Sequence, residues 1–496
     1  MWDLLLGGCA DILNPHVLGM MLVGTVFGII GGATPGISGA MTLALFLPLS
    51  FGFNSVTSLA LMISLYVGSM SGGLISAVLL KIPGTPAAMA TTFDGAPMAE
   101  KGEAGRALGI GIVFSFIGGI ISIVLLSIMA PLLAKVTLQF SYYEYFAVGI
   151  FALTIISAVG SGSMLKSLIG AVIGFFISFV GVGSISPFPR YTFGLKDLRG
   201  GFNILTVMIG FYAVSQLLNA GNRELGTDQG KVLKFRMKGF GFSLKEMKEQ
   251  TGNAILSALI GVGIGILPGL GGSVSNLAAY AAVKKKSHYP EKFGTGIIDG
   301  IVASETSNNA TVGGAMIPLM TLGIPGDNTT AILLAAFMIH GITPGPLLFE
   351  KEARLVYSVF AAALLAHFFM LVVEYFGIRI FVRILTIKSY ILLPVVAALC
   401  GVGAYTVNNR IFDVWCMIGF GLLGFALEKL GFSLATVILG MILGPIIELN
   451  YCRGMQRSLG NFVPFLTSPI SGTILAATAI IVIAACIRAV RQRQTA

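Results

Sequence analysis

The sequence predicts an all-α polytopic membrane protein, and three observations lead to this class. Of the 496 residues, 55% are hydrophobic and only 10% are charged, whereas a soluble protein carries roughly 25% charged residues. The charges are also unevenly spread, since Ile12–Leu80 contains no Asp, Glu, Lys or Arg. Such a stretch far exceeds the roughly 20 apolar residues that one membrane-crossing helix requires. A soluble enzyme, a nucleic-acid-binding domain and a secreted disulfide scaffold are therefore excluded.

Apolar blocks continue along the rest of the chain. Several of them are long enough for two passes, so we expect about 10–14 membrane segments, including broken or re-entrant helices. The blocks are centred roughly on residues 17–50, 56–80, 107–133, 145–184, 202–220, 253–283, 297–323, 329–349, 355–385, 389–408, 411–447 and 465–487.

One basic segment separates the chain into two halves. Residues 221–250 form the only long polar stretch in the middle, and Lys and Arg outnumber the acids there, which is typical of a cytoplasmic loop. We expect a first repeat half at 1–220, this loop at 221–250, and a second repeat half with C-terminal membrane helices at 251–496. Loops of this kind also explain the net charge of +10.

Motifs that would indicate other chemistry are absent from the sequence. The five cysteines show neither CxxC spacing nor metal-ligand spacing with histidine, so we interpret them as small apolar fillers. The N-terminus lacks the basic stretch of a signal peptide, so the first apolar segment is expected to stay in the mature protein. No G-x-x-x-x-G-K-[ST] sequence occurs, and an ATP-driven step would need another subunit. We predict no catalytic set, no metal cluster and no enzyme activity.

Two motifs recur in the same order in both halves. In the first register, GIIGGATPGISGA near residue 30 matches GVGIGILPGLGGS near residue 265, with Pro35 on Pro268. In the second register, KIPGTP at 81–86 matches GIPGDN at 323–328, with Pro83 on Pro325. In the first register Gly28, Gly32, Gly36 and Gly39 fall on Gly261, Gly265, Gly269 and Gly272. Two motifs in matched order indicate a duplication.

A Pro-Gly pair inside an apolar run breaks a helix. Proline lacks a backbone donor and clashes with the preceding turn, while glycine lets the chain turn either way. Lipid cannot satisfy the freed backbone groups, so such breaks are tolerated only inside protein or beside a water-filled cavity. Close helix packing through glycine is the alternative interpretation. Paired broken helices in two halves favour the central binding site of a transporter.

Positive charge flanks only the second copy of the first motif. The basic segment precedes Pro268 and Lys284–Lys286 follow it, so both flanks are expected in the cytoplasm, with residues 253–283 forming a re-entrant hairpin. The first copy has no Lys or Arg before Lys81, and its flanks are expected outside. We therefore predict two inverted repeats, with one hairpin entering from each side.

Polar groups inside the apolar segments are the functional candidates. Hydroxyls, amides and freed backbone amides bind carboxylates, and freed carbonyl oxygens suit a hard cation such as sodium. For any single Ser or Thr, ordinary interhelical hydrogen bonding is the alternative. The substrate-binding candidates are Pro35, Gly36, Ser38, Pro83, Gly84, Thr85, Pro268, Gly269, Ser273, Asn308, Asn309, Pro325, Gly326, Asp327, Asn328 and Thr329. The coupling-ion candidates are Glu305, Asn276, Thr311 and Ser71.

Some charged candidates have two interpretations. Glu305 is either a proton or cation ligand or a paired structural carboxylate. Lys81 either attracts an anion or extends from a helix end to the interface. His340 and His367 have no partner at ligand spacing, and we interpret both as structural.

Five stretches resemble the large membrane subunit of the tripartite tricarboxylate transporters, the TctA-type permeases. The most specific is IPGTPAAMATTFDGAPMAEKGEAG at 82–105, and the resemblance runs over nearly the whole chain in the same order. The stretches lie at 31–50, 72–109, 265–287, 303–346 and 434–448.

The resemblance implies partners and a driving force. Such a subunit works with a small membrane subunit of four helices and a periplasmic solute-binding protein that delivers a carboxylate. It resides in the bacterial inner membrane, and a gradient of sodium ions or protons drives uptake, with no other cofactor. A self-sufficient ion-coupled anion carrier remains the alternative, because broken helices and inverted repeats are compatible with it as well. An intramembrane enzyme or a channel fits less well, because neither a nucleophile-and-base pair nor a repeated filter is present.

Overall fold

The computed structural model describes residues 2–159, 164–183, 185, 187–222, 239–384 and 389–494. Within them the regular structure is helical except for one pair of two-residue strands. This confirms the predicted all-α class. Six described helices are long and apolar enough to cross a membrane, and shorter apolar helices accompany them. The six span Pro15–Ala33, Ser55–Leu79, Thr91–Thr137, Ala353–Arg383, Ile411–Lys429 and Leu434–Arg457.

The chain divides into two compact units, which are described separately. Unit 1 comprises Met1–Ala134, Gln216–Ile266 and Leu270–Gly403, and unit 2 comprises Lys135–Ser215, Leu267–Gly269 and Ala404–Ala496. Both units draw residues from both sides of the basic segment, so they do not test the expected halves 1–220 and 251–496. Most of the basic loop 221–250 lies outside the described residues.

Unit 1 comprises helices from both sides of the basic segment. In its first part these are α1 Trp2–Ile12, α2 Pro15–Ala33, α3 Gly39–Ser50, α4 Ser55–Leu79, η1 Pro86–Ala88, α5 Thr91–Met98, η2 Ala99–Glu103 and α6 Ala104–Thr137, which continues into unit 2. After the basic segment come α11 Leu244–Glu249, α12 Thr251–Gly265, α13 Gly271–Lys286, η5 Pro290–Lys292, α14 Ile298–Leu322, α15 Asn328–Ile339, α16 Leu348–Lys351, α17 Ala353–Ile384 and α18 Ser389–Asn408, whose end belongs to unit 2.

Unit 2 combines helices with a short hairpin. Strand β1 (Gly181–Val182) pairs antiparallel with β2 (Pro189–Arg190). The Arg190 guanidinium donates to both carboxylate oxygens of Glu448, at 2.5 and 3.1 Å, which holds this hairpin against α20. The remaining elements are α7 Tyr142–Val159, α8 Met164–Ser178, η3 Lys196–Gly200, α9 Ile204–Met208, η4 Ile209–Val214, α10 Ser215–Asn222 at the border with unit 1, α19 Ile411–Lys429, α20 Leu434–Arg457, α21 Val463–Thr467 and α22 Pro469–Gln494.

The helices of unit 1 break at the four Pro-Gly pairs, as predicted from the sequence. The interruptions are Thr34–Ser38, Leu80–Thr85, Ile266–Leu270 and Gly323–Asp327. Gly36 and Gly269 have φ of 92° and 78°, a left-handed conformation in which a Cβ would be strained. Gly323, at 71°, ends α14 as a left-handed cap. Helices α12 and α13 pack against each other on either side of Pro268, and their re-entrant course in the membrane stays a prediction.

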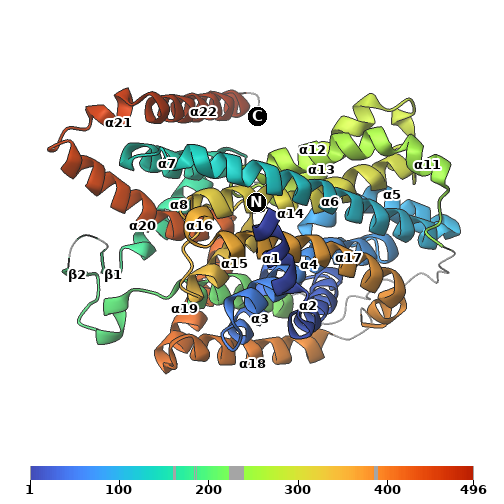
Figure 1. Ribbon diagram of the computed structural model, residues 1–496, viewed down its shortest axis with the longest axis horizontal. Coiled ribbons are helices and arrows are strands. Elements are labelled where there is room, and N and C mark those ends of the chain that lie inside the picture. The colour runs from blue at the N-terminus through green and yellow to red at the C-terminus, as the bar shows by residue number, and fades with distance from the viewer. Residues whose placement is uncertain are drawn as a thin grey trace. The chain divides into compact units, whose positions relative to one another are not determined.

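The core of unit 1 is formed by two helices that occupy matched places in the repeat. Every residue of α4 from Thr57 to Leu79 is buried, and so is α14 from Gly300 to Thr321. Helix α2 packs along α4, and α12 packs along α14 (Figure 1). Because both central helices are shielded on all sides, their polar side chains must find partners within the protein.

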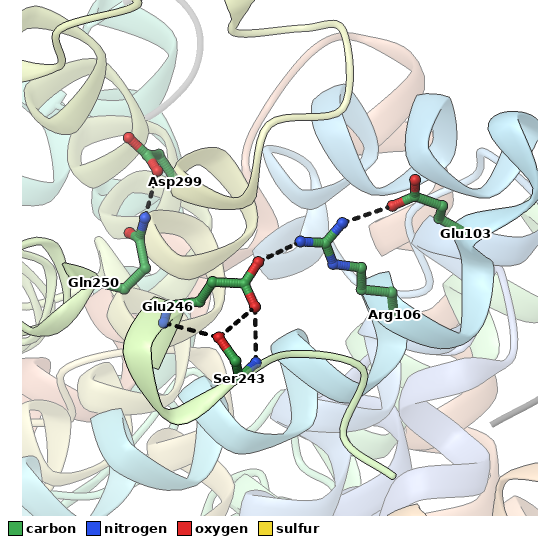
Figure 2. Close-up of polar contacts among 6 residues, drawn as sticks. All are labelled: Glu103, Arg106, Ser243, Glu246, Gln250 and Asp299. Carbon is green, nitrogen blue, oxygen red and sulfur yellow. Dashed lines mark hydrogen bonds and ion pairs between the residues drawn. The ribbon is translucent and has the colours of Figure 1, made fainter. Parts of the chain in front are cut away.

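Polar contacts fix the segment before α12 onto helix α6 (Figure 2). The Arg106 guanidinium donates to Glu103 at 3.0 Å and to Glu246 at 2.5 Å. Glu246 also forms a capping box with Ser243 at the start of α11, and the amide of Gln250 donates to Asp299 at 2.5 Å. The hydrogen bond from the Ser243 backbone amide is the main cause that lowers the pKa of Glu246. The Ser243 hydroxyl and the Arg106 charge lower it further, and together they outweigh the desolvation of the carboxyl group.

Candidate substrate and ion site

The two copies of the repeat share the same close helix contacts. A Cβ built on Gly28 of α2 would lie 2.5 Å from the Leu65 carbonyl oxygen on α4. The residues that match them are Gly261 and Ser307, and a Cβ on Gly261 would lie 2.4 Å from the Ser307 carbonyl oxygen. A side chain at either glycine would force the helices apart, which explains glycine at these matched positions.

In both copies the second motif packs directly against the first. A Cβ on Gly84 would lie 2.1 Å from the Gly32 carbonyl oxygen, and one on Gly326 would lie 2.4 Å from the Gly265 carbonyl oxygen. Gly32 matches Gly265 in the first register and Gly84 matches Gly326 in the second. The duplication is therefore present in the backbone arrangement as well as in the sequence. These contacts carry no reference to a bilayer, so the inverted orientation stays a prediction.

Residues of each copy also contact residues of the other copy. At the start of α3, Gly39 lies beside Thr329, since a Cβ there would be 3.5 Å from the Thr329 hydroxyl oxygen. At the start of α13, Gly272 lies beside Ala87, since a Cβ built on Gly272 would be 2.9 Å from the Ala87 Cβ. These two contacts also match under the registers, because Gly39 corresponds to Gly272 and Ala87 to Thr329. The breaks of unit 1 therefore converge in pairs across the two halves.

Three polar side chains connect the two copies at this convergence. The Tyr66 hydroxyl on α4 donates to Asp327 Oδ2 at 2.6 Å. The Asn276 amide on α13 donates to the carbonyl oxygens of Pro86 and Ala87. The Asn308 amide on α14 donates to the Met70 carbonyl oxygen at 3.0 Å. All three donors are buried, so the connections are shielded from solvent.

The three half-helices that begin here are capped differently. Ser38 caps α3 by accepting from the Met41 amide at 3.1 Å, and Asp327 caps α15 by accepting from the Thr330 amide at 2.7 Å. None of the described side chains caps α13, which begins at Gly271. Of the three helix starts, its first amides are therefore the ones without a side-chain acceptor.

Several buried oxygens in this region have no hydrogen-bond partner among the described residues. They are the amide oxygens of Asn276 and Asn308 and the hydroxyl of Thr85. Amide oxygens only accept, so they suit a cation or a ligand that donates. A carboxylate beside the α13 terminus and a cation beside these oxygens are chemically compatible neighbours.

Known proteins were compared with the whole chain. The sequence profile of the tripartite tricarboxylate transporter TctA family matches residues 18–439. The chain belongs to this family. A protein of Agrobacterium vitis, described as "Uncharacterized 52.8 kDa protein in TAR-I ttuC' 3'region", is 33% identical to this TctA chain over 491 residues, which cover 98% of the chain and 96% of the relative. A second, "Uncharacterized protein in TAR-II ttuC' 3'region", is 34% identical over 231 residues, 47% of the chain and 96% of the relative.

No solved structure matches the chain. The family match confirms the resemblance drawn from the motifs at 31–50, 72–109, 265–287 and 303–346. This TctA chain is therefore a membrane component of a tripartite tricarboxylate transporter.

The structure gathers part of the predicted substrate site of this TctA chain in unit 1. Ser38 receives a further hydrogen bond from Gln216, at 3.2 Å, and a Cβ on Gly73 would lie 2.9 Å from the Thr85 hydroxyl. The predicted residues that lie in or next to the breaks, or that connect the two copies, are Pro35, Gly36, Ser38, Pro83, Gly84, Thr85, Ser273, Asn308, Pro325, Gly326, Asp327, Asn328 and Thr329. Their role in binding stays a prediction.

Other predicted residues lie elsewhere. Pro268 and Gly269 belong to unit 2, where a Cβ on Gly269 would lie 2.5 Å from the Ile156 side chain. Among the described residues, the Asn309 side chain hydrogen-bonds only along its own helix, from its amide to the Glu305 carbonyl oxygen. Lys81 is exposed and pairs with Glu100 at 3.2 Å, which fits the interpretation of a side chain extending from a helix end.

The coupling-ion candidates do not form one cluster. Asn276 lies at the convergence, while Thr311 is hydrogen-bonded to Ser275 at 2.7 Å between α14 and α13. Glu305 accepts from Thr91 and Ser115, and Ser71 donates to Glu374.

Sequence reasoning missed two polar residues of the buried core. Tyr66 was detectable because the second register matches it with Asn308. Glu374 was detectable as an isolated acid in the apolar stretch between Arg354 and Arg379, where an intramembrane charge is a functional candidate.

Proposed function

We propose that this chain is the permease subunit for ion-gradient-driven uptake of a tricarboxylate or related organic anion across the bacterial inner membrane. It acts with a small four-helix membrane subunit and a periplasmic solute-binding protein. The observation that carries the proposal is the convergence of broken helices from two duplicated halves, in a chain of a transporter family. Paired broken helices form the substrate site in many secondary transporters.

The chemistry of the convergence supports an anionic substrate accompanied by a cation. The uncapped amides of α13, with the hydroxyls of Ser38, Ser273 and Thr329, donate to a carboxylate. Asp327 lies beside the same helix start, since a Cβ on Gly271 would be 2.7 Å from its Cβ. A second carboxylate next to Asp327 is repelled unless a cation or a proton is present. Binding of the substrate is thereby linked to binding of the coupling ion.

The duplication supports alternating access. If the two copies are inverted in the membrane, equivalent motions open the site first to one side and then to the other. The glycine contacts between α2 and α4 and between α12 and α14 make these helices two similar, closely packed pairs. Uptake then depends on movement of these pairs around the site.

Transport into vesicles tests the proposal. The chain and its small partner are reconstituted, and entry of labelled citrate and succinate is measured with and without the binding protein. Each measurement is made under an imposed sodium gradient and an imposed proton gradient. We expect accumulation only with binding protein and one of the two gradients. Gradient-driven uptake without binding protein would support the self-sufficient carrier, and no uptake under any condition would contradict both.

A further inference from the structure

Two acidic side chains are buried in unit 1 away from the Pro-Gly breaks. Glu374 on α17 and Glu305 on α14 are both fully buried. Glu374 Oε2 accepts from the Ser71 hydroxyl on α4 at 2.5 Å. Glu305 accepts from Thr91 at 2.5 Å and from Ser115 at 2.9 Å. Hydroxyl groups of neighbouring helices are thus the hydrogen-bond partners of both acids.

Helix α6 brings their two helices into one cluster. Ser115 of α6 contacts Glu305, and one turn further on, a Cβ on Gly118 would lie 2.2 Å from the Thr306 carbonyl oxygen of α14. A Cβ on the next residue, Gly119, would lie 1.9 Å from the His367 ring of α17. The two consecutive glycines thus allow α6 to fit closely between α14 and α17.

The cluster lacks a compensating positive charge. No ion pair joins Glu374 or Glu305 to a Lys or Arg among the residues that the structure describes. Glu374 Oε1 and His367 Nε2 are buried and have no hydrogen-bond partner there. Two neighbouring buried carboxyl groups without a counter-charge cannot both be ionised, so the cluster must hold a proton or a cation.

The geometry favours a proton over a metal ion. Within the described part of the chain, no three His, Cys, Asp or Glu side chains are arranged to hold a metal. The hydroxyl partners come from α4, α5 and α6 and bind different carboxyl oxygens, so the oxygens do not surround a single point. A proton needs only one free oxygen, and Glu374 Oε1 provides it.

We propose that Glu374 is the binding site of a proton that is co-transported with the carboxylate. The proton is carried on Oε1, while Oε2 keeps the hydrogen bond from Ser71. Glu305 is the neighbouring carboxyl group that prevents both acids from being ionised together. This assignment rests on the proposed transport function and adds the ion and its site to it.

Other titratable groups also lie on α17 and on the helices packed against it. Helix α1 carries Asp11, which pairs with Arg354 at the beginning of α17 at 2.6 Å. Helix α4 carries Tyr66, which donates to Asp327. The others on α1, α2, α6, α16 and α17 are Asp3, Cys9, His16, Arg106, Lys135, Glu350, Lys351, His367, Tyr357, Tyr375, Arg379 and Arg383. Of all these groups, His367 is the one that shares the buried face with Glu374 and contacts α6.

Two transport modes separate coupling from substrate binding. In vesicles with binding protein on both sides, labelled citrate or succinate outside exchanges for unlabelled substrate inside, and no net proton movement is needed. In empty vesicles a proton gradient drives accumulation, and a pH dye inside reports proton entry. For Glu374→Gln we expect exchange near the wild-type rate, while gradient-driven accumulation and proton entry fall by about tenfold or more, within the usual range of coupling between linked sites.

A matched control is Glu352→Gln, because Glu352 is exposed and directly precedes α17; it should behave as the wild type in both modes. Glu374→Asp keeps a titratable group and should retain proton entry. Full proton-driven accumulation by Glu374→Gln would overturn the proposal. Loss of exchange in both Glu374 variants would also overturn it, provided that size-exclusion chromatography shows each variant to be folded. If wild-type uptake is driven only by a sodium gradient, the assignment of a proton site to Glu374 is wrong, while the proposed function of carboxylate uptake still holds.

Discussion

The two copies of the repeat have the same backbone contacts but different side-chain chemistry. Gly84 rests on Gly32 in the first copy as Gly326 rests on Gly265 in the second. At the polar positions the copies differ, because the second register matches Tyr66 with Asn308 and Thr85 with Asp327. The helix arrangement is therefore symmetric, while the donors and acceptors around it are not. The symmetric helix arrangement is compatible with two similar conformations, one open to each side. The different donors and acceptors in the two copies are compatible with a substrate that binds in one orientation.

The largest effect should come from filling the matched glycine contacts. Gly84→Ala and Gly326→Ala each place a Cβ within 2.1–2.4 Å of a backbone oxygen. We expect both to abolish uptake and to lower stability by about 2–3 kcal/mol through overpacking. Gly263→Ala, at a glycine with open space around it, is the control. Thermal unfolding in detergent and vesicle uptake provide the measurements, and tolerance of alanine at one site only would show that the copies are not equivalent.

The next effect tests the difference between Asp327 and its match Thr85. Asp327→Ala removes the cap of α15, at about 1 kcal/mol, and leaves the buried Tyr66 hydroxyl unpaired, at about 1–3 kcal/mol. Thr85→Ala removes a hydroxyl without a partner in the described structure, so only the lost burial of its methyl group, about 1 kcal/mol or less, should lower the stability. If Thr85 binds substrate, this variant raises KM. Equal destabilisation by the two variants would contradict the asymmetry.

A smaller effect distinguishes two neighbouring amides on α14. Asn308 bonds to Met70 in the other copy, whereas Asn309 bonds only along its own helix. Asn308→Ala should reduce uptake about tenfold, corresponding to the roughly 1–1.5 kcal/mol of a buried hydrogen bond. Asn309→Ala is the matched control and should retain most of the uptake. The reverse order in initial uptake rates would place the site on the other face of α14.

The smallest effect concerns the polar contacts outside the apolar helices. Glu246→Gln weakens a pair with Arg106 in which both side chains are about one-third exposed, and such pairs contribute less than about 1 kcal/mol. The folded pKa of Glu246 is lowered below its usual 4.5, so its contribution is present above that value and disappears as the pH falls through the folded pKa. The Tm difference from wild type should therefore be small at neutral pH and vanish in acid, with uptake unchanged. A Tm difference that grows in acid would contradict this sign.

The sequence was sufficient for the class, the four breaks and the duplication, because charge-free runs and Pro-Gly pairs act locally. The pairing of Gly39 with Thr329 and of Gly272 with Ala87 was not predictable, since it depends on how distant helices pack. The same holds for Glu374, whose relation to Glu305 arises only when α6 lies between α14 and α17. Asn308 and Asn309 are adjacent in sequence, and only the packing of α14 separates their roles.

The hydrogen bond from Asn276 to Ala87 has a consequence for biosynthesis. The two residues are 189 positions apart, so at roughly 5–20 residues per second the ribosome needs about 10–40 s between them. During that time the carbonyl oxygens of Pro86 and Ala87 are already made, and their eventual donor is not. Water, the insertion machinery or a neighbouring subunit must satisfy them meanwhile, because lipid offers no donor. The carbonyl oxygens of Pro86 and Ala87 therefore obtain their final donor only after α13 has been made.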